Sequence, residues 1–503
     1  MTQNYLEKIL TSRVYDVAKI TPFEKAIQLS KRLDNSVFFK REDLQPVHSF
    51  KIRGAYNKMA HLSKAALERG VIAASAGNHA QGVALGAKTL KCQAMIVMPA
   101  TTPSIKVNAV KNYGAKVILY GDSYTEAYHH AKKIARAEKL TYIHAYDDPD
   151  VIAGQGTVGM EILQQSLSPV HAIFVPIGGG GLAAGIGAYV KQIHPRTKII
   201  GVEPVDSNAM ALSLKANRLV DLDYVGLFAE GVAVKTVGKE TFRLCRKYVD
   251  EVVLVDTDEI CAAIKDVFDD SRTVLEPSGA LSVAGMQAYV KKNKLKDKTL
   301  ACVLSGANMN FYRLRHVAER AEVGEEREAL FAVTIPETPG SFKKLINAIG
   351  HKMVTEFNYR FNDPRDAHVF MGLGIHDRSE IPAILDKLRE AGFDAVDLTG
   401  NEMAILHLRH LVGGPARHDD NELFYRVEFP ERVGALMNFL NSLSHDWNIS
   451  LFHYRNHGTD YGRVLVGLQV PAKQRAKVER SLDKLGYVYY DETENLACRL
   501  FLR

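Results

Sequence analysis

Short apolar runs alternate with longer amphipathic stretches over residues 35–320 of the chain. "GVIAASAGN" precedes "HAQGVALGAKTL", "CQAMIVMPA" precedes "TTPSIKVNAVKNYG", and "HAIFVPIGGGG" precedes "LAAGIGAYVKQIH". The apolar runs have the length of buried strands, and the stretches that follow them carry apolar residues at helical spacing. This alternation predicts an α/β fold with mostly parallel strands, in which ligands bind beyond the carboxyl ends of the strands.

The pattern changes after about residue 320, where a charged stretch precedes an internal repeat. One copy starts "ALFAVTIPETPGSFKKLINAIG" at Ala329, and the other starts "ELFYRVEFPERVGALMNFLNSLS" at Glu422. Pro336 matches Pro430, and each copy has the pattern of a strand, a turn, a helix, two strands, a helix and a strand. The sequence therefore predicts a first region followed by two α+β repeats, with the bounds 1–320, 328–402 and 422–495.

The run from Ala172 to Val190 contains no charged residue over 19 positions. By length alone it could span a membrane. A proline and six glycines interrupt it, however, and its first part has the pattern of a strand. We interpret it as a buried strand, a glycine loop and a helix, and we expect no membrane partner.

Composition narrows the class of protein. Of 503 residues, 46% are hydrophobic and 24% are charged, which is typical of a soluble globular protein. The net charge of +6 comes from interleaved acidic and basic residues, so we expect no nucleic-acid partner. The five cysteines lie far apart without a CxxC motif, and no apolar signal segment is evident. These features predict free thiols in a reducing, cytoplasmic compartment.

The segment Ser75-Ala76-Gly77-Asn78-His79 lies between a predicted strand and a predicted helix. Backbone N–H groups at a helix start bind anions such as carboxylates, and an asparagine amide can both donate and accept. An ordinary capped turn has a similar composition. The segment by itself therefore leaves both interpretations open.

Residues 178–182, "GGGGL", also stand between a predicted strand and a predicted helix. Four consecutive glycines allow the backbone to approach a phosphate closely, with several N–H groups directed at it. Glu203 follows at about the distance of the ribose-binding acid in dinucleotide enzymes. The G-x-G-x-x-G fingerprint cannot be read from any of the four glycines, however. The run predicts a phosphate site of another design.

Two further features are weak signals when taken alone. Ser305-Gly306-Ala307-Asn308 ends another predicted strand, and Lys51 lies in "SFKIRGA". Most helical lysines are solvated, but a nucleophilic amine must be neutral, and burial or a nearby cation lowers the pKa of a lysine. Nearby residues in the sequence include Arg53, but the sequence leaves open whether its side chain faces this amine.

A lysine, a phosphate site and a carboxylate-binding helix start on one α/β scaffold match the needs of an amino-acid enzyme that uses pyridoxal phosphate. In that order, "SFKIRGA", "SAGNHAQG", "GGGGL" and "SGAN" resemble the fold-type II pyridoxal phosphate enzymes, and within them the threonine dehydratase (threonine ammonia-lyase) family. The resemblance covers residues 1–320 and implies a catalytic region of two subdomains. The repeats resemble the two ACT-like regulatory repeats of the biosynthetic form.

The resemblance implies a role for each matched position. Lys51 would hold the cofactor as a Schiff base and, once released, would act as the base at the α-carbon. Phe50 would pack beside the cofactor ring, Asn78 would bind the ring hydroxyl, and Ser305 would meet the ring nitrogen. The cofactor phosphate would lie on Gly178, Gly179, Gly180, Gly181 and Leu182. The substrate would lie on Ser75, Ala76, Gly77, Asn78 and His79.

One position favours a dehydratase among the related activities. Serine racemases of this family carry a second serine where this chain has Ala76, and that serine is the base on the opposite face. A divalent-cation site of those racemases lies near the equivalent of Glu203, where Ser207 and Ala209 provide no matching carboxylate. We therefore expect no metal at this site, while a monovalent cation stays open.

The resemblance implies conversion of L-threonine to 2-oxobutanoate and ammonia, and of L-serine to pyruvate more slowly, as the first step of isoleucine synthesis. It also implies a homotetramer that isoleucine inhibits and valine reactivates. The alternatives are another lyase of this class such as threonine synthase, a non-catalytic amino-acid sensor, and a dinucleotide-dependent enzyme. The intact Lys51 argues against the sensor, and the missing fingerprint argues against the dinucleotide enzyme. For the repeats, the alternative is a role in the oligomer interface alone.

Overall fold

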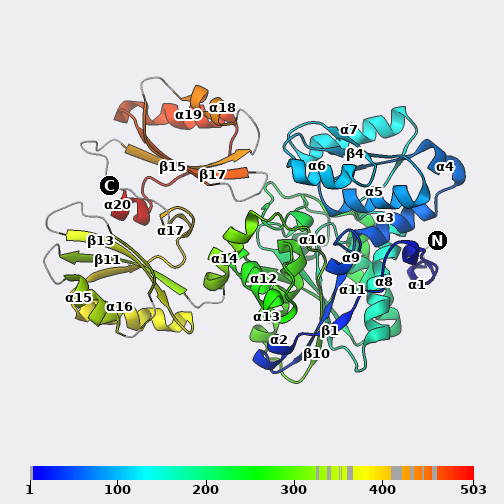
Figure 1. The fold of residues 1–503 in the computed structure, drawn as a ribbon, viewed down its shortest axis with the longest axis horizontal. Coiled ribbons are helices and arrows are strands. Elements are labelled where there is room, and N and C mark those ends of the chain that lie inside the picture. The colour runs from blue at the N-terminus through cyan, green and yellow to red at the C-terminus, as the bar shows by residue number, and fades with distance from the viewer. Residues whose placement is uncertain are drawn as a thin grey trace. The chain divides into compact units, whose positions relative to one another are not determined.

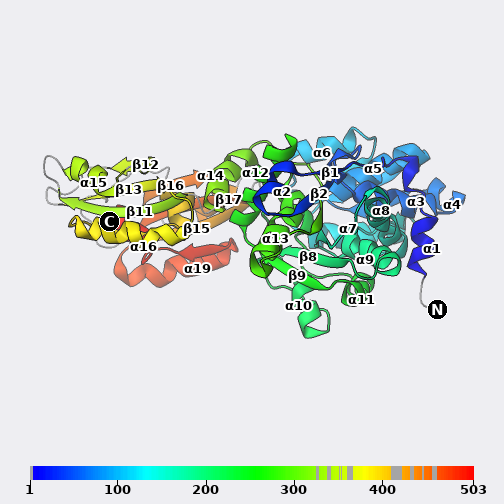
Figure 2. The ribbon, with the colours of Figure 1, turned by 90° about the horizontal axis from the view of Figure 1, so that it is seen from below.

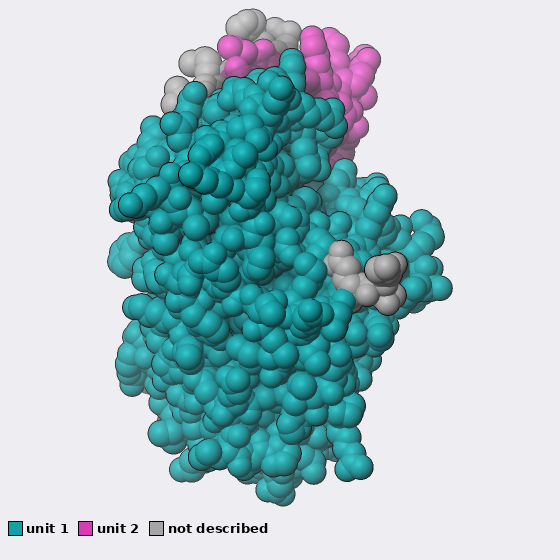
Figure 3. Space-filling model, turned by 90° about the vertical axis from the view of Figure 1, so that its right-hand side faces the viewer, with its two compact units in different colours: residues 1–311 teal, residues 312–503 magenta. Residues whose placement is uncertain are grey.

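A computed structural model describes residues 4–324, 328–336, 341–350, 352, 354–359, 366–408, 422–430, 435–443, 447–455 and 461–502. The chain forms two compact units, residues 1–311 and residues 312–503, shown in different colours in Figure 3. None of the helices in the described ranges combines the length and the apolar character that a bilayer crossing requires. The run of residues 172–190 forms a buried strand, a glycine loop and most of a helix, as predicted.

The larger sheet of the first unit has the order β1-β2-β10-β7-β8-β9. β1 is antiparallel to β2, and the other neighbours are parallel. The strands are β1 Phe23–Lys25, β2 Ser36–Lys40, β7 Ala172–Pro176, β8 Lys198–Pro204, β9 Glu251–Val255 and β10 Thr299–Val303. Every residue of β7 is buried, as is typical of a parallel strand covered by helices on both faces.

The smaller sheet of this unit has the order β5-β4-β3-β6, and all its neighbours are parallel. Its strands are β3 Val71–Ala74, β4 Ala94–Met98, β5 Lys116–Leu119 and β6 Thr141–Tyr142. The asparagine segment follows β3, the glycine run follows β7, and "SGAN" follows β10. The predicted fold class, with mostly parallel sheets in two subdomains, is confirmed for this region.

Helices cover both sheets (Figures 1 and 2). They are α1 Tyr5–Leu10, α2 Ile27–Arg32, α3 Lys51–Ala60, α4 Lys64–Arg69, α5 Asn78–Leu90, α6 Ser104–Lys111, α7 Tyr124–Ala137, α8 Pro149–Gln165, α9 Gly181–Ile193, α10 Ala209–Ala216, α11 Lys239–Tyr248, α12 Thr257–Ser271 and α13 Pro277–Asn293. Local sequence fixes several starts. At α8, for example, Asp148 accepts hydrogen bonds from the first turn, and a proline occupies a first-turn position where its missing N–H costs nothing.

Helix α3, which begins at Lys51, lies close to both α5 and α8 because glycines stand at the crossing points. A Cβ on Gly82 of α5 would lie 3.2 Å from the Lys51 carbonyl oxygen, and one on Gly54 of α3 would lie 2.7 Å from the Val151 carbonyl oxygen of α8. A side chain at either glycine would push the helices apart. The glycines therefore bring the start of α3 next to the helix that begins at Asn78.

The second unit begins with α14, Arg313–Gly324, and contains two sheets with the same strand order, β12-β13-β11-β14 and β16-β17-β15-β18. All neighbouring strands are antiparallel. The first copy comprises β11 Glu328–Pro336, α15 Ser341–Ile349, β12 Val354–Tyr359, β13 Asp366–Gly374, α16 Ile381–Glu390, β14 Asp394–Asp397 and α17 Glu402–Leu406. The second comprises β15 Glu422–Pro430, α18 Ala435–Ser442, β16 Asn448–Arg455, β17 Tyr461–Gln469, α19 Arg475–Leu485, β18 Tyr489–Asp491 and α20 Leu496–Phe501. The predicted repeat of α+β units is confirmed, while its turns at 337–340 and 431–434 lie outside the described residues.

Buried apolar residues lie on both faces of the two sheets in the second unit. Along β11, Phe331 and Val333 point into the core formed with α15 and α16. Leu330 and Ala332 point the other way, into a core shared with α17, α20 and the sheet of the second copy. Figure 1 shows α17 and α20 between the two sheets. Alternate residues of a strand face opposite sides, so one apolar strand serves both cores.

Candidate active site

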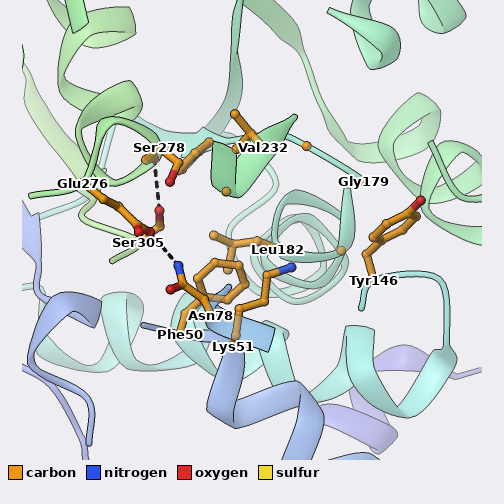
Figure 4. A pocket seen from close by; sticks show the side chains of 15 residues that line it. Phe50, Lys51, Asn78, Tyr146, Gly179, Leu182, Val232, Glu276, Ser278 and Ser305 are labelled. Carbon is orange, nitrogen blue, oxygen red and sulfur yellow. Dashed lines mark hydrogen bonds between the residues drawn. The ribbon is translucent and has the colours of Figure 1, made fainter. Parts of the chain in front are cut away.

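A cavity that opens to solvent lies at the carboxyl ends of β7 and β10 in the first unit. The cavity brings together all nine predicted cofactor positions from four distant stretches of sequence (Figure 4). These positions are Phe50, Lys51, Asn78, Gly178, Gly179, Gly180, Gly181, Leu182 and Ser305.

Lys51 is not a solvated lysine. Its Nζ donates a hydrogen bond of 3.1 Å to the carbonyl oxygen of Ala145 and lies 5.2 Å from the centre of the Phe50 ring. Burial lowers the pKa of Lys51 to about 8, and the negative charge of Glu276 acts in the opposite direction. About a tenth of this amine is therefore neutral at pH 7, against less than a thousandth for an exposed lysine.

The Arg53 side chain points away from this amine. Its guanidinium donates to the carboxylates of Glu42 and Glu161 at 2.6–3.0 Å, and Lys40 donates to Glu161 at 2.5 Å. All four side chains are buried. The sequence left open whether the Arg53 side chain faces the Lys51 amine. In the structure it does not, since Arg53 belongs to a buried ionic network. Burial is what lowers the pKa of Lys51.

The glycine run turns sharply into helix α9. Gly180 has φ of +92°, which favours glycine, and no side chain caps the helix start. A Cβ on Gly179 would lie 2.2 Å from Cγ of Tyr146, and the Gly179 carbonyl oxygen accepts a 2.6 Å hydrogen bond from the Thr241 hydroxyl. The packing of this loop therefore excludes side chains, and the N–H groups at the start of α9 provide an anion site on the cavity wall.

The amide of Asn78 is held at both ends. Its Nδ2 donates to Oε1 of Glu276 at 2.6 Å, and its Oδ1 accepts from Nδ2 of Asn308 at 2.7 Å. Ser49, just before the lysine, pairs with Gly306 in an isolated β-bridge. These contacts join the lysine, asparagine and "SGAN" segments in one constellation.

Asn78 is the member of the asparagine segment that lines the cavity in the described structure. The His79 ring lies 3.0 Å from the Ile143 carbonyl oxygen, and burial lowers the pKa of His79 to about 3. A Cβ on Gly77 would meet no atom within 4 Å, so the loop leaves open space beside the cavity. Contact of Ser75, Ala76, Gly77 and His79 with a substrate stays a prediction.

Ser305 lines the cavity, and its hydroxyl donates to the carbonyl oxygen of Ser278 at 3.1 Å. The hydrogen of a serine hydroxyl can rotate about the Cβ–Oγ bond. The same oxygen can therefore donate to a ring nitrogen in the cavity instead. As a neutral group, Ser305 cannot stabilise a protonated ring nitrogen as a carboxylate would.

Several cavity residues were missed from the sequence. Glu276 precedes Pro277, the first residue of α13, and Tyr146 follows β6 by a few residues. The remaining members are Pro176, Gly231, Val232 and Ser278. The rule that ligands bind after parallel strands could have found Tyr146, whereas Glu276 follows no strand and gave no such signal.

The Glu203 carboxylate is engaged elsewhere. It accepts hydrogen bonds from the N–H groups of Met210 at 3.0 Å and Ala211 at 2.8 Å, at the start of α10. Burial raises the pKa of Glu203 to about 8, and these hydrogen bonds partly offset the effect. Both oxygens of Glu203 therefore bind the start of α10. The carboxylate of a ribose-binding acid would instead be directed at its ligand. Across the described residues, no three or more His, Cys, Asp or Glu side chains are grouped as metal ligands would be.

The residues of the cavity fit pyridoxal phosphate. Lys51 offers an amine of lowered pKa for the aldehyde, and the start of α9 offers N–H groups for the phosphate. Asn78 and Ser305 offer an amide and a hydroxyl for the polar atoms of the ring.

Comparison with known proteins agrees with this chemistry. Residues 14–306 match the family described as pyridoxal-phosphate dependent enzyme, and residues 319–408 and 413–502 each match the C-terminal regulatory domain of threonine dehydratase. The biosynthetic L-threonine dehydratase of Burkholderia multivorans is 58% identical over 504 residues, covering 100% of this chain and 99% of that protein. The enzyme of the same name from Escherichia coli is 51% identical, covering 99% and 97%.

A solved structure, the processed form of threonine deaminase isoform 2 from Solanum lycopersicum, is 52% identical to this chain. It aligns with a TM-score of 0.62 over 63% of this chain and 92% of its own. The structural match has the extent expected for the catalytic region, whereas the sequence relatives cover the regulatory repeats as well. The chain therefore belongs to the pyridoxal-phosphate dependent enzymes and, within them, to the biosynthetic threonine dehydratases.

Proposed function

We propose that the protein converts L-threonine to 2-oxobutanoate and ammonia, and L-serine to pyruvate more slowly, at the first step of isoleucine synthesis. The observation that carries this proposal is the shared cavity of the Lys51 amine and the glycine run before α9. A lowered pKa at a lysine in a cavity is typical of a catalytic amine. The sequence relatives add the choice of threonine as substrate.

Each of the nine predicted cofactor positions has a place in binding the cofactor. Lys51 binds the aldehyde, the N–H groups of residues 178–182 bind the phosphate, Asn78 binds the ring hydroxyl, Ser305 faces the ring nitrogen, and Phe50 packs beside the ring. When bound, pyridoxal phosphate supplies an electron sink for the pair left at the α-carbon after deprotonation.

The amine of Lys51 removes the α-proton of threonine. Its pKa of about 8 lies close to neutral pH, where a general base combines a useful neutral fraction with sufficient basicity. After proton transfer the side chain is an ammonium, and the Ala145 carbonyl oxygen, 3.1 Å from Nζ, can accept one of its hydrogens. The bond from the β-carbon to the hydroxyl then breaks, and the hydroxyl takes up one proton and leaves as water. A water molecule later adds as the amino group leaves as ammonia, so no water is consumed overall and the products have the atoms of threonine.

A direct test follows 2-oxobutanoate by mass spectrometry after purified protein is mixed with L-threonine. Lys51→Ala should abolish the product and the visible absorbance of the lysine-bound cofactor. Lys64→Ala removes an exposed lysine and should leave both unchanged. Absence of product from the unmodified protein would instead favour a non-catalytic amino-acid sensor, and formation rather than consumption of threonine would favour a threonine synthase.

The repeats bind amino-acid effectors in this proposal, with isoleucine as inhibitor and valine as antagonist. Their match to a regulatory domain supports a regulatory role. Isoleucine can inhibit only if it binds the less active state more tightly than the active state. The test is to measure the threonine rate against isoleucine concentration with and without valine. Rates that do not respond to either amino acid would leave the repeats with an interface role alone.

The proposal includes a homotetramer in the cytoplasm, with repeats bounded at 328–402 and 422–495. Light scattering during size-exclusion chromatography measures the mass of the assembly against the 55.8 kDa of one chain. A mass other than four chains would refute the tetramer.

A further inference from the structure

Glu276 is a half-buried residue whose backbone is fixed at both ends. Its N–H donates to the Gly306 carbonyl oxygen at 3.3 Å, and its own carbonyl oxygen accepts from the N–H of Gly279 at 2.8 Å in the first turn of α13. The side chain points into the cavity beside Asn78 and Ser305 (Figure 4). The position of this carboxylate is therefore set by the fold and not by a flexible loop.

The surrounding glycines leave room for this side chain. A Cβ on Gly306 would lie 2.5 Å from Oε1 of Glu276, and a Cβ on Gly279 would lie 2.1 Å from the Gly306 carbonyl oxygen. Real Cβ atoms do not approach backbone atoms so closely, so position 279 requires glycine. A side chain at position 306 would displace the Glu276 carboxylate from its place beside Asn78.

The carboxylate decides which way the Asn78 amide points. An ionised carboxylate only accepts hydrogen bonds, and the Asn308 Nδ2 only donates. Asn78 therefore directs Nδ2 to Glu276 and Oδ1 to Asn308, as observed at 2.6 Å and 2.7 Å. The second N–H of its Nδ2 remains for the cavity. Asn308 is itself anchored by a 2.8 Å hydrogen bond to the Val47 carbonyl oxygen.

The charge of Glu276 also acts on the lysine. It opposes the effect of burial on the Lys51 pKa. Burial raises the pKa of Glu276 itself, and hydrogen bonds from Asn78 and Ser278 partly offset this. Other charged groups also act here. Glu230 raises and Lys106 lowers the pKa of Glu276, and burial and the charge of Lys51 contribute to the lowered pKa of His79 and of His144.

We propose that Glu276 is a positioning residue of the active site, which orients the Asn78 amide toward the cofactor and keeps a negative charge in the cavity that the Lys51 amine also lines. A neutral side chain of the same shape would lose both effects. The charge would no longer favour the Lys51 ammonium, and an amide at this position could donate, so Asn78 could turn over and present its oxygen to the cavity. The orientation of Asn78 rests on the proposed cofactor, whereas the effect of the charge on Lys51 does not.

The test uses Glu276→Gln in the full-length chain, with Glu138→Gln as the same change at an exposed carboxylate. Trace acetic anhydride labels the amines of the cofactor-free protein across pH, and mass spectrometry follows the Lys51 peptide. We expect the labelling of Lys51 to be half-maximal near pH 8 in the unmodified protein and in Glu138→Gln, and this pH is the Lys51 midpoint. In Glu276→Gln the midpoint should fall by about one pH unit, the effect of one nearby charge. Cofactor affinity should fall about three- to tenfold, as for one hydrogen bond.

Asn308→Ala separates the two effects. It removes the donor to Asn78 Oδ1 but keeps the carboxylate that accepts from Asn78 Nδ2, so cofactor affinity should fall less than in Glu276→Gln and the Lys51 midpoint should stay unchanged. Circular dichroism confirms that each variant is folded. If Glu276→Gln fails to fold, Glu276→Asp replaces it, because it keeps the charge but draws the carboxylate away from Asn78 and should lower cofactor affinity. An unchanged Lys51 midpoint or unchanged cofactor affinity in folded Glu276→Gln, or unchanged cofactor affinity in the Glu276→Asp that replaces it, would overturn the inference. None of these results would affect the proposed function, which depends on threonine turnover by the unmodified protein.

Discussion

Arg53→Met tests whether the buried ionic network holds the helix that carries Lys51. In the structure the Arg53 guanidinium makes hydrogen bonds to both oxygens of Glu42 and both oxygens of Glu161. The side chains of Arg53 and Glu42 are 0% exposed, and that of Glu161 is 1% exposed. Methionine fills a similar length without charge, so the substitution chiefly removes the partner of two buried carboxylates.

The expected loss in the free energy of unfolding is about 3–5 kcal/mol, the usual effect of removing one partner from a buried ion pair. Lys40 still neutralises Glu161, so one carboxylate, Glu42, is left without an ion-pair partner. Burial by itself raises the pKa of Glu42, but Arg53, together with Lys40 and the Thr21 hydroxyl, outweighs burial and holds that pKa below its ordinary value of 4.5. Without Arg53, the pKa of Glu42 should rise above 4.5.

The pH dependence follows from these signs. In the unmodified protein, the ionised Glu42 stabilises the fold above pH 4.5, and this contribution is lost as pH falls through its lowered pKa. In Arg53→Met the ionised Glu42 carboxylate is buried without its partner at neutral pH, and this destabilises the fold. The destabilisation disappears as Glu42 takes up a proton. The difference in stability between the two proteins should therefore shrink on acidification.

Urea unfolding followed by circular dichroism at several pH values measures this difference. The single tryptophan, Trp447, lies in the second unit, so its fluorescence reports on the regulatory region separately and serves as an internal control. Glu42→Gln combined with Arg53→Met should recover part of the loss, because it removes the unpaired charge. A loss below about 1 kcal/mol, or one that stays constant with pH, would refute the reasoning.

Two further predictions concern the glycine run and Glu203. Gly179→Ala would place a Cβ 2.2 Å from the Tyr146 ring, whereas Gly181→Ala would place one 3.2 Å from Cα of Tyr146. Equilibrium titration should therefore show a larger loss of cofactor affinity for Gly179→Ala, and equal losses would contradict the packing argument. Burial raises the pKa of Glu203 from 4.5 to about 8, so its contribution to stability is present below pH 4.5 and is lost progressively as pH rises to 8. Glu203→Gln should flatten the stability profile between pH 4.5 and 8 in thermal unfolding, and an unchanged slope would contradict this.

Local sequence was sufficient for most elements of the fold. The strand and helix after each apolar run follow from spacing, as at β7 and α9, because a parallel strand is apolar on both faces. The repeat was also visible, since both copies have the same order of elements. The shared core around Leu330 was not visible, because an apolar residue in a strand does not show which element covers it.

The sequence by itself determined which chemical groups this protein carries, a lysine, a run of four glycines, an asparagine and a serine, each at the end of a predicted element. Only the tertiary structure decided which of them meet. It turned Arg53 away from Lys51 toward Glu42, and it brought Glu276 to Asn78 across 198 positions of the chain. The physical reason is that burial and distance set the pKa of an amine and the orientation of an amide. Both depend on close packing between segments whose separation in the sequence does not predict their contact.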